Sequence, residues 1–194
     1  MTEPAESQRV EDIATQSQCG VGVNRGTVLY SFKVFKRFMR HGLILEMGAA
    51  ERFMSDTLAH FGQPLQVIEA SSRFCEELRG RYPSPKIVHG LFEDFTPAER
   101  FANIILGHVL KHVQDPSALL TRAGPWLADE GRLFAAIPNS RSLHRQAAVF
   151  MGLLPFEEAL NDADRNHGHR RVYNPETFRR EILQAGLDIQ IFGG

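Results

Sequence analysis

The sequence predicts an α/β fold in which a mostly parallel sheet is covered by helices on both faces. Two observations support this. Short apolar runs bounded by Gly, Pro or Ser alternate with amphipathic stretches, as expected for strands buried on both faces and joined by crossover helices. The 194 residues, 43% of them hydrophobic, are enough for one core. In such a fold, ligands bind beyond the carboxyl ends of the strands.

The chain begins with a polar segment that lacks apolar periodicity. We interpret residues 1 to 25 as a flexible N-terminal arm or lid outside the core, followed by a domain over residues 26 to 194. Residues 28–39 place three Phe residues at helical spacing, which predicts an amphipathic helix packed on the sheet, although such a stripe can also line a ligand pocket.

From residue 43 onward, strands and helices are expected to alternate. The expected strands are residues 43–46, 65–69, 87–90, 101–106, 131–137 and 188–192. The expected helices are residues 51–61, 71–81, 116–127 and 174–185. Ser71 or Ser72 can cap the helix at residues 71–81. Asn174 can cap the helix at residues 174–185, with Pro175 in its first turn. Residues 140–173 break the alternation and concentrate His, Asp and Arg, so we interpret them as an insertion that covers the substrate.

The turn after the first expected strand carries the strongest local signal. In GLILEMGAAERFM, residues 42–54, an apolar run ends at Glu46 and Gly48 and is followed at once by helix-forming residues. About 20 residues later, a second apolar run ends at Glu69, where nucleotide-binding folds place a ribose-binding carboxylate. The turn lacks the second and third glycines of the dinucleotide-binding pattern G-x-G-x-x-G. Without the second apolar run, residues 42–54 could therefore equally be an ordinary turn between a strand and a helix.

Composition excludes several classes of function. The net charge of −1 offers no field for nucleic acid or an anionic membrane, and no apolar run is long enough to span a bilayer. Cys19 and Cys75 form no C-x-x-C pair, so neither a zinc site nor a disulfide framework is indicated. The acidic, polar N-terminus differs from a signal peptide, and we expect a cytoplasmic protein.

Four segments together resemble the class I S-adenosylmethionine-dependent methyltransferases. They are LEMG (45–48), VIE (67–69), ILGHVLKHV (105–113) and LFAAIPN (133–139). The sequence GHRRVY (168–173) further resembles bacterial methyltransferases that act on sugars and natural products. The resemblance implies a Rossmann-like methyltransferase fold, S-adenosylmethionine as cofactor, and a small polar acceptor such as a sugar, a nucleotide-sugar or a natural-product intermediate.

The resemblance also implies roles for individual residues. Gly48 lets the backbone approach the methionine part of the cofactor, Glu46 holds its ammonium group or orients the turn, and Glu69 accepts both ribose hydroxyls. The remaining predicted cofactor-binding residues are Leu91 and Phe92 beside the adenine, and Gly107 and His108 beneath the methyl group.

A hydroxyl acceptor requires a base, and histidine titrates in the right range. The candidates are His108, His112, His144, His167 and His169. We favour His144 and His169 as catalytic because both lie in the insertion, although for any single histidine a surface or structural role is more common than catalysis. Asp162, Asp164, His167 and His169 match no metal-binding template, so we predict a solvated loop and no metal site. Arg170 and Arg171 are candidates to grip a phosphate or carboxylate.

The sequence also departs from the family pattern. Ala50 and Arg52 replace the later glycines of the first motif, and Lys111 replaces an acid of the fourth-strand motif. The final antiparallel strand of the family's sheet, which lies between the fifth and sixth strands, is missing from residues 1–194. These departures leave a catalytically impaired homologue, acting as a binding or partner module, as the alternative. A nicotinamide-dependent oxidoreductase is disfavoured because the three-glycine turn is absent.

Overall fold

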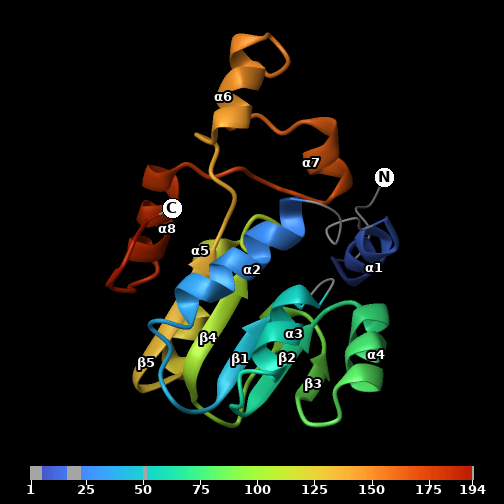
Figure 1. Cartoon of the computed structure of the whole chain (residues 1–194), viewed down its shortest axis with the longest axis vertical. Coiled ribbons are helices and arrows are strands. Elements are labelled where there is room, and N and C mark those ends of the chain that lie inside the picture. Colours follow the sequence, from blue (N-terminus) through green and yellow to red (C-terminus); the bar gives the residue numbers. More distant parts are fainter. Residues whose placement is uncertain (1–5, 17–22, 50–51, 194) are drawn as a thin grey trace. The chain divides into compact units, whose positions relative to one another are not determined.

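The computed structural model describes residues 6–16, 23–49 and 52–193. The chain divides into two compact units, which are described separately. The first comprises Met1–Gly107 and Trp126–Ala136, and the second comprises His108–Pro125 and Ile137–Gly194. Figure 1 shows the helices and strands of both units.

The first unit contains a five-stranded parallel sheet in the order β3-β2-β1-β4-β5. The strands are β1 (Ile44–Met47), β2 (Leu65–Glu69), β3 (Lys86–His89), β4 (Phe101–Gly107) and β5 (Leu127–Ala136). The chain runs outward from β1 to β3 and then returns to place β4 on the other side of β1. The crevice at this reversal of strand order is where doubly wound sheets bind ligands, so the carboxyl ends of β1 and β4 define the candidate site.

In the described part of this unit there are four α-helices, besides the short 3-10 helix at Phe92–Asp94. They are α1 (Glu6–Gln16), α2 (Val23–Phe35), α3 (Phe53–Ala59) and α4 (Ser72–Arg81). Phe32 of α2, Leu58 of α3 and Leu78 of α4 are buried in one core with residues of β1, β2 and β4. Phe32 and Phe35 of the aromatic stripe predicted for residues 28–39 therefore pack in the core, in a helix that begins five residues earlier than expected and ends at Phe35, before Phe38. Ser71 caps α4, as predicted, by accepting a hydrogen bond from the Phe74 N–H.

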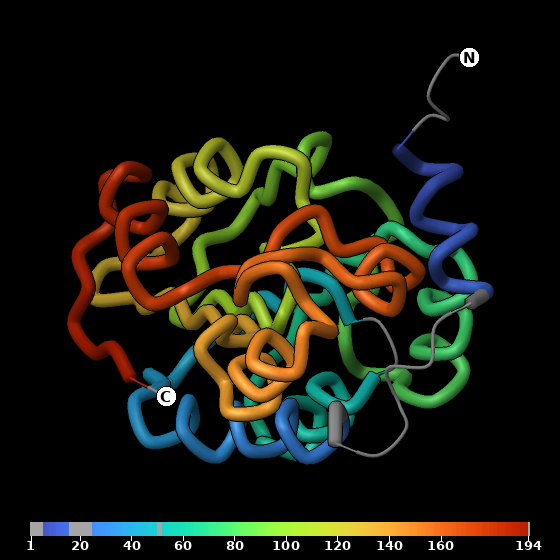
Figure 2. The backbone as a smooth tube through the Cα atoms, turned by 90° about the horizontal axis from the view of Figure 1, so that it is seen from above, coloured from blue at the N-terminus to red at the C-terminus, as the bar shows by residue number. Residues whose placement is uncertain are grey.

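Residues 6–16 lie within the segment predicted to be a flexible arm, yet they form the regular helix α1. Ala14 is buried in the structure, and the Arg73 guanidinium donates to its carbonyl oxygen at 3.1 Å. Figures 1 and 2 both show α1 beside α4. The sequence did not predict this helix, because its contacts are made with residues about 60 positions away and leave little trace in local periodicity. The flexibility of the arm stays a prediction.

The second unit contains α5 (Pro116–Ala123), α6 (Leu143–Phe150), α7 (Asp162–Asn166) and α8 (Pro175–Gln184). Asn174 caps α8 by accepting a hydrogen bond from the Thr177 N–H, and Pro175 follows in the first turn, as predicted. The Ser140 N–H donates to the Tyr173 carbonyl oxygen at 2.8 Å, so the two ends of the predicted insertion lie side by side. None of the described helices is long and apolar enough to cross a membrane.

The predicted strand over residues 188–192 is wrong, because these residues join no strand ladder. The Phe192 ring instead packs on α8, 6.1 Å from the Phe178 ring and 4.4 Å from the Arg179 guanidinium carbon. A strand requires a paired neighbour, and no described strand of the sheet pairs with these residues. The helix predicted over residues 116–127 ends at Ala123 because Pro125 follows closely.

Candidate functional site

The turn after β1 is shaped by a glycine. Gly48 has a φ of 78°, a left-handed conformation that favours glycine, and its N–H donates to the Ile68 carbonyl oxygen of β2 at 2.8 Å. The next N–H, that of Ala49, donates to Glu69 Oε2 at 2.8 Å. The turn and the acid that the sequence singled out are therefore in direct contact, whereas Ala50 lies outside the described residues.

The Glu69 carboxylate is buried at the carboxyl end of β2. Its second oxygen, Oε1, accepts the Ser71 N–H at 2.9 Å, and the residue is only 6% exposed. Glu69 is thus held by two backbone donors at the carboxyl end of β2, the position that the sequence predicts for the ribose ligand.

Glu46 is a buried acid in the central strand of the sheet. It is 1% exposed, and neither carboxylate oxygen accepts a hydrogen bond from a described residue. Burial, reinforced by the neighbouring Glu69 carboxylate, raises the pKa of Glu46 to about 8; the nearby Ser55 hydroxyl opposes this but makes no hydrogen bond of good geometry. With this pKa the carboxyl is mostly protonated at pH 7 in the ligand-free protein, and a cationic group binding beside it would favour the ionised form.

Arg52 precedes α3 instead of lying in its first turn. It is the N-cap residue of α3, with a φ of 67°, and its Nε lies 3.9 Å from Asp56 Oδ2. The expectation that Arg52 is a helical residue is wrong, because its backbone is left-handed. This conformation costs about 1–2 kcal/mol for a residue with a side chain, whereas glycine adopts it readily.

The other predicted cofactor residues of the first unit border the same edge of the sheet. Leu91 and Phe92 follow β3 and are partly buried, and the Gly90 N–H just before them donates to the Glu69 carbonyl oxygen at 3.0 Å. Gly107 ends β4, where a Cβ atom would lie 3.3 Å from Met54 Cε. Glycine therefore keeps the backbone of β4 close to α3 at the ligand-binding edge.

In the second unit, the first residue is His108, which also has a left-handed backbone, with a φ of 63°. Burial and the nearby Lys111 charge lower the pKa of the His108 side chain to about 4. The ring is therefore neutral at pH 7.

His169 is oriented by a buried chain of charged groups. Its Nδ1 lies 2.9 Å from Asp164 Oδ1, while Arg145 Nη1 lies 3.2 Å from Asp164 Oδ2. Burial acts against ionisation of Asp164, but hydrogen bonds from the Asn161 N–H and from Arg145 hold its pKa below the usual range. The ionised carboxylate can only accept, so Nδ1 of His169 carries the proton and Nε2 presents a lone pair.

The structure does not bring the two favoured histidines together. His144, on α6, is exposed, and its Nε2 lies 3.5 Å from the Ser142 hydroxyl. His169 instead packs edge-to-face against His112, with ring centroids 5.0 Å apart, and burial and Lys111 lower its pKa to about 4. Sequence reasoning missed the role of Arg145, which is 7% exposed, because nothing in the local pattern distinguishes it from a surface arginine.

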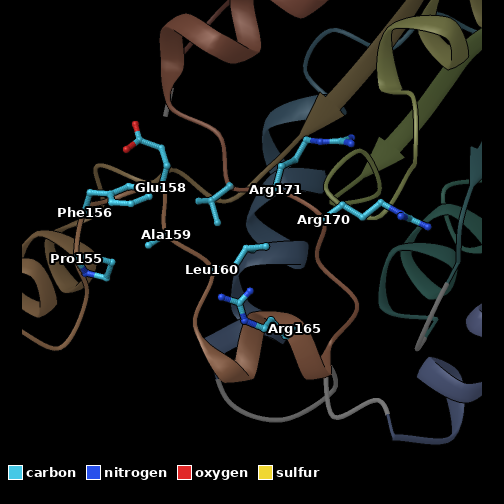
Figure 3. Close-up of a pocket in the computed structure, with 9 residues that line it drawn as sticks. Pro155, Phe156, Glu158, Ala159, Leu160, Arg165, Arg170 and Arg171 are labelled. Carbon is cyan, nitrogen blue, oxygen red and sulfur yellow. The ribbon is translucent and has the colours of Figure 1, made fainter. Parts of the chain in front are cut away.

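A pocket of about 510 Å³ lies within the predicted insertion (Figure 3). Its lining combines apolar residues with charged ones: Pro155, Phe156, Glu158, Ala159, Leu160, Arg165, Arg170, Arg171 and Val172. Figure 3 shows Arg170 and Arg171 extending away from the side formed by Pro155 and Phe156.

The prediction that Arg170 and Arg171 grip an anion conflicts with their contacts. The Arg171 guanidinium donates to the carbonyl oxygens of Val113 and Gln114 at 2.7 and 2.8 Å, and Arg170 Nε donates to the His112 carbonyl oxygen. Both arginines therefore bind backbone. Among the described residues, the guanidinium of Arg165 has no hydrogen-bond or ion-pair partner, and no group of three or more His, Cys, Asp or Glu side chains could hold a metal ion.

Comparison with known proteins identifies the family. Residues 29–190 match the model of a methyltransferase domain. The chain belongs to the class I S-adenosylmethionine-dependent methyltransferases, as the sequence predicts. No curated protein sequence matches it significantly.

Solved structures show the same fold at low identity. DhpI in complex with SAM and HEP matches with a TM-score of 0.67 and 15% identity, covering 93% of this chain and 88% of DhpI. The plantazolicin methyltransferase BpumL, with a pentazolic desmethylPZN analogue and SAH, matches with a TM-score of 0.63 and 12% identity, covering 91% and 74%. The CcbJ methyltransferase from Streptomyces caelestis matches with a TM-score of 0.54 and 16% identity, covering 69% of this chain and only 57% of CcbJ.

Proposed function

We propose that this protein transfers a methyl group from S-adenosylmethionine to a hydroxyl or amine of a small polar acceptor, such as a sugar or natural-product intermediate. The observation that carries the cofactor assignment is the buried Glu46 carboxylate, which lacks a donor among the described residues and lies close to Glu69 and to the Gly48 turn. A cation with attached hydroxyl groups complements this arrangement.

Each chemical group of the cofactor is assigned to particular residues of the first unit. Glu46 would hold the ammonium group, Glu69 would accept the ribose hydroxyls, and Gly48 would admit the methionine portion. Leu91 and Phe92 supply partly buried apolar surface for the adenine. When bound, S-adenosylmethionine supplies an electrophilic methyl group attached to a sulfonium; the protein supplies alignment and exclusion of water.

For a hydroxyl acceptor, His169 is the better candidate for the base. Asp164 holds its Nδ1–H, so that the Nε2 lone pair is available to the acceptor's proton. The lowered pKa keeps the ring unprotonated at pH 7 but makes it a weak base, so the orientation by Asp164 is what supports this role. His144 is the second candidate, and its exposed position on α6 favours contact with the acceptor over proton transfer inside a closed site.

The acceptor-binding region is proposed to be the insertion, residues 140–173. Its pocket offers an apolar wall at Phe156 and the guanidinium of Arg165, which suits an acceptor with a ring or aliphatic part and a carboxylate or phosphate. The complexes of DhpI with HEP and of BpumL with a desmethylPZN analogue support an acceptor of the natural-product class. A cytoplasmic location stays a prediction from the sequence.

A catalytically impaired homologue that acts as a binding module is the second candidate, because Arg52 occupies a glycine position of the cofactor turn and Lys111 replaces an acid. Calorimetric titration of the intact protein with S-adenosylmethionine and with NADH tests both proposals. Binding of S-adenosylmethionine alone supports the enzyme, and binding of neither supports the module. Binding of NADH alone would instead revive the oxidoreductase.

A further inference from the structure

Glu11 of α1 contacts the amino end of α4 through two hydrogen bonds. Its Oε2 accepts the Ser71 hydroxyl at 3.0 Å, and its Oε1 accepts the Ser72 N–H at 2.6 Å. One carboxylate therefore bridges the side chain of the α4 N-cap and the first N–H of α4. A negative charge is favoured at the amino end of a helix, which adds to these two hydrogen bonds.

The contact residue Ser71 also holds the predicted ribose ligand. Its N–H donates to Glu69 Oε1 at 2.9 Å, and Ser71 is completely buried. The same residue thus receives Glu11 on its hydroxyl and orients Glu69 through its backbone. Any change in the position of Ser71 is transmitted to the Glu69 carboxylate through one hydrogen bond.

We propose that Glu11 is a positioning residue for the cofactor site. It docks α1 on the turn between β2 and α4 and thereby holds Glu69 in its binding orientation. Docking of α1 and binding of the cofactor therefore strengthen each other. This inference rests on the proposed function. The coupling is reciprocal, because a ligand that binds better to the docked form must also favour docking.

Two further observations support the docked helix. The Arg73 guanidinium donates to the Ala14 carbonyl oxygen at 3.1 Å, so α1 is held one turn further along as well. The hydrogen bonds from Ser72 and Ser71 hold the pKa of Glu11 below its usual range, although desolvation acts against this. The Glu11 carboxylate is therefore ionised, and able to bridge both donors, across the neutral pH range.

The neighbouring residue Asp12 provides a matched control. It carries the same charge on the same helix, but its carboxylate accepts only the exposed Gln8 amide among the described residues, at 2.9 Å. Asp12→Ala therefore removes one acid from α1 without touching Ser71 or Ser72. Glu11→Gln is the conservative variant, because its amide oxygen can accept one of the two donors.

The test combines calorimetric titration of S-adenosylmethionine into the full chain with hydrogen exchange of the α1 amides. Glu11→Ala should weaken affinity about five- to tenfold and Glu11→Gln less, as typical for coupled sites. Asp12→Ala should stay within about twofold of the unaltered chain, as expected for an exposed contact. The cofactor should slow exchange of the α1 amides in the unaltered chain and slow it less in Glu11→Ala.

The outcomes separate this inference from the proposed function. Binding to the unaltered chain, with equal dissociation constants for Glu11→Ala and Asp12→Ala, would overturn the role of Glu11 alone. Unchanged exchange of the α1 amides on cofactor binding would do the same. If Glu11→Ala does not fold, the affinity of Glu11→Gln relative to Asp12→Ala decides. Absence of binding to the unaltered chain would overturn both the inference and the proposed function.

Discussion

Replacing Glu46 with glutamine should make the ligand-free protein more stable at alkaline pH. The Glu46 carboxyl is 1% exposed, lacks a hydrogen-bond partner among the described residues, and has a pKa of about 8. In the unfolded chain the same group titrates near 4.5. Between these two values the folded state retains a proton that the unfolded state releases, so the free energy of unfolding falls as pH rises.

The size of this effect follows from the linkage slope. A difference of one bound proton between the folded and unfolded states changes the free energy of unfolding by about 1.4 kcal/mol per pH unit. Between pH 5 and pH 8, the titration of Glu46 therefore lowers the free energy of unfolding by about 4 kcal/mol at most. Water penetration and local relaxation reduce this, and about 2–4 kcal/mol is a realistic range. Glutamine has a similar shape and does not titrate, so Glu46→Gln removes this pH dependence.

Urea denaturation at pH 5, 6, 7 and 8 gives the free energy of unfolding of Glu46→Gln and of the unaltered chain. The difference between the two proteins at each pH isolates the effect of Glu46, because the contributions of the other titrating groups cancel. The stability advantage of Glu46→Gln should grow with pH. Glu69→Gln is the control: it replaces a carboxylate that accepts two backbone N–H groups, so it should lower stability. A stability difference between Glu46→Gln and the unaltered chain that stays constant from pH 5 to pH 8 would refute the reasoning.

Three further predictions concern the proposed activity. Glu69→Ala should weaken S-adenosylmethionine binding by about 1.5–3 kcal/mol, the range for hydrogen bonds to a charged group; an unchanged dissociation constant with an intact fold would remove Glu69 from the site. Arg52→Gly should raise the free energy of unfolding by about 1 kcal/mol, because glycine fits the left-handed backbone, and should tighten cofactor binding; lower stability would show that the Asp56 contact matters more than the backbone. His169→Ala, and to a lesser degree His144→Ala, should lower turnover of an identified acceptor with nearly unchanged cofactor affinity; equal loss of cofactor binding in both would indicate structural roles.

Much of the fold can be predicted from the sequence because it depends on local patterns. Short apolar runs bounded by turn residues identify β1 to β5, and the end of the second run places Glu69 at the edge where ligands bind. Ser71 and Asn174 are recognisable as helix caps from their position alone. The glycine at residue 48 signals the turn, and its left-handed backbone agrees with that signal.

Other features are decided only by tertiary contacts. The sequence shows an acid at Glu46, but its raised pKa comes from burial in the centre of a sheet whose strands are far apart along the chain. Likewise, Arg145 becomes a buried partner of Asp164 only when α6 and α7 come together, and Glu11 meets Ser71 across 60 residues. Local periodicity cannot encode such pairs, because hydrogen bonding, desolvation and strand pairing depend on which distant groups the fold brings into contact.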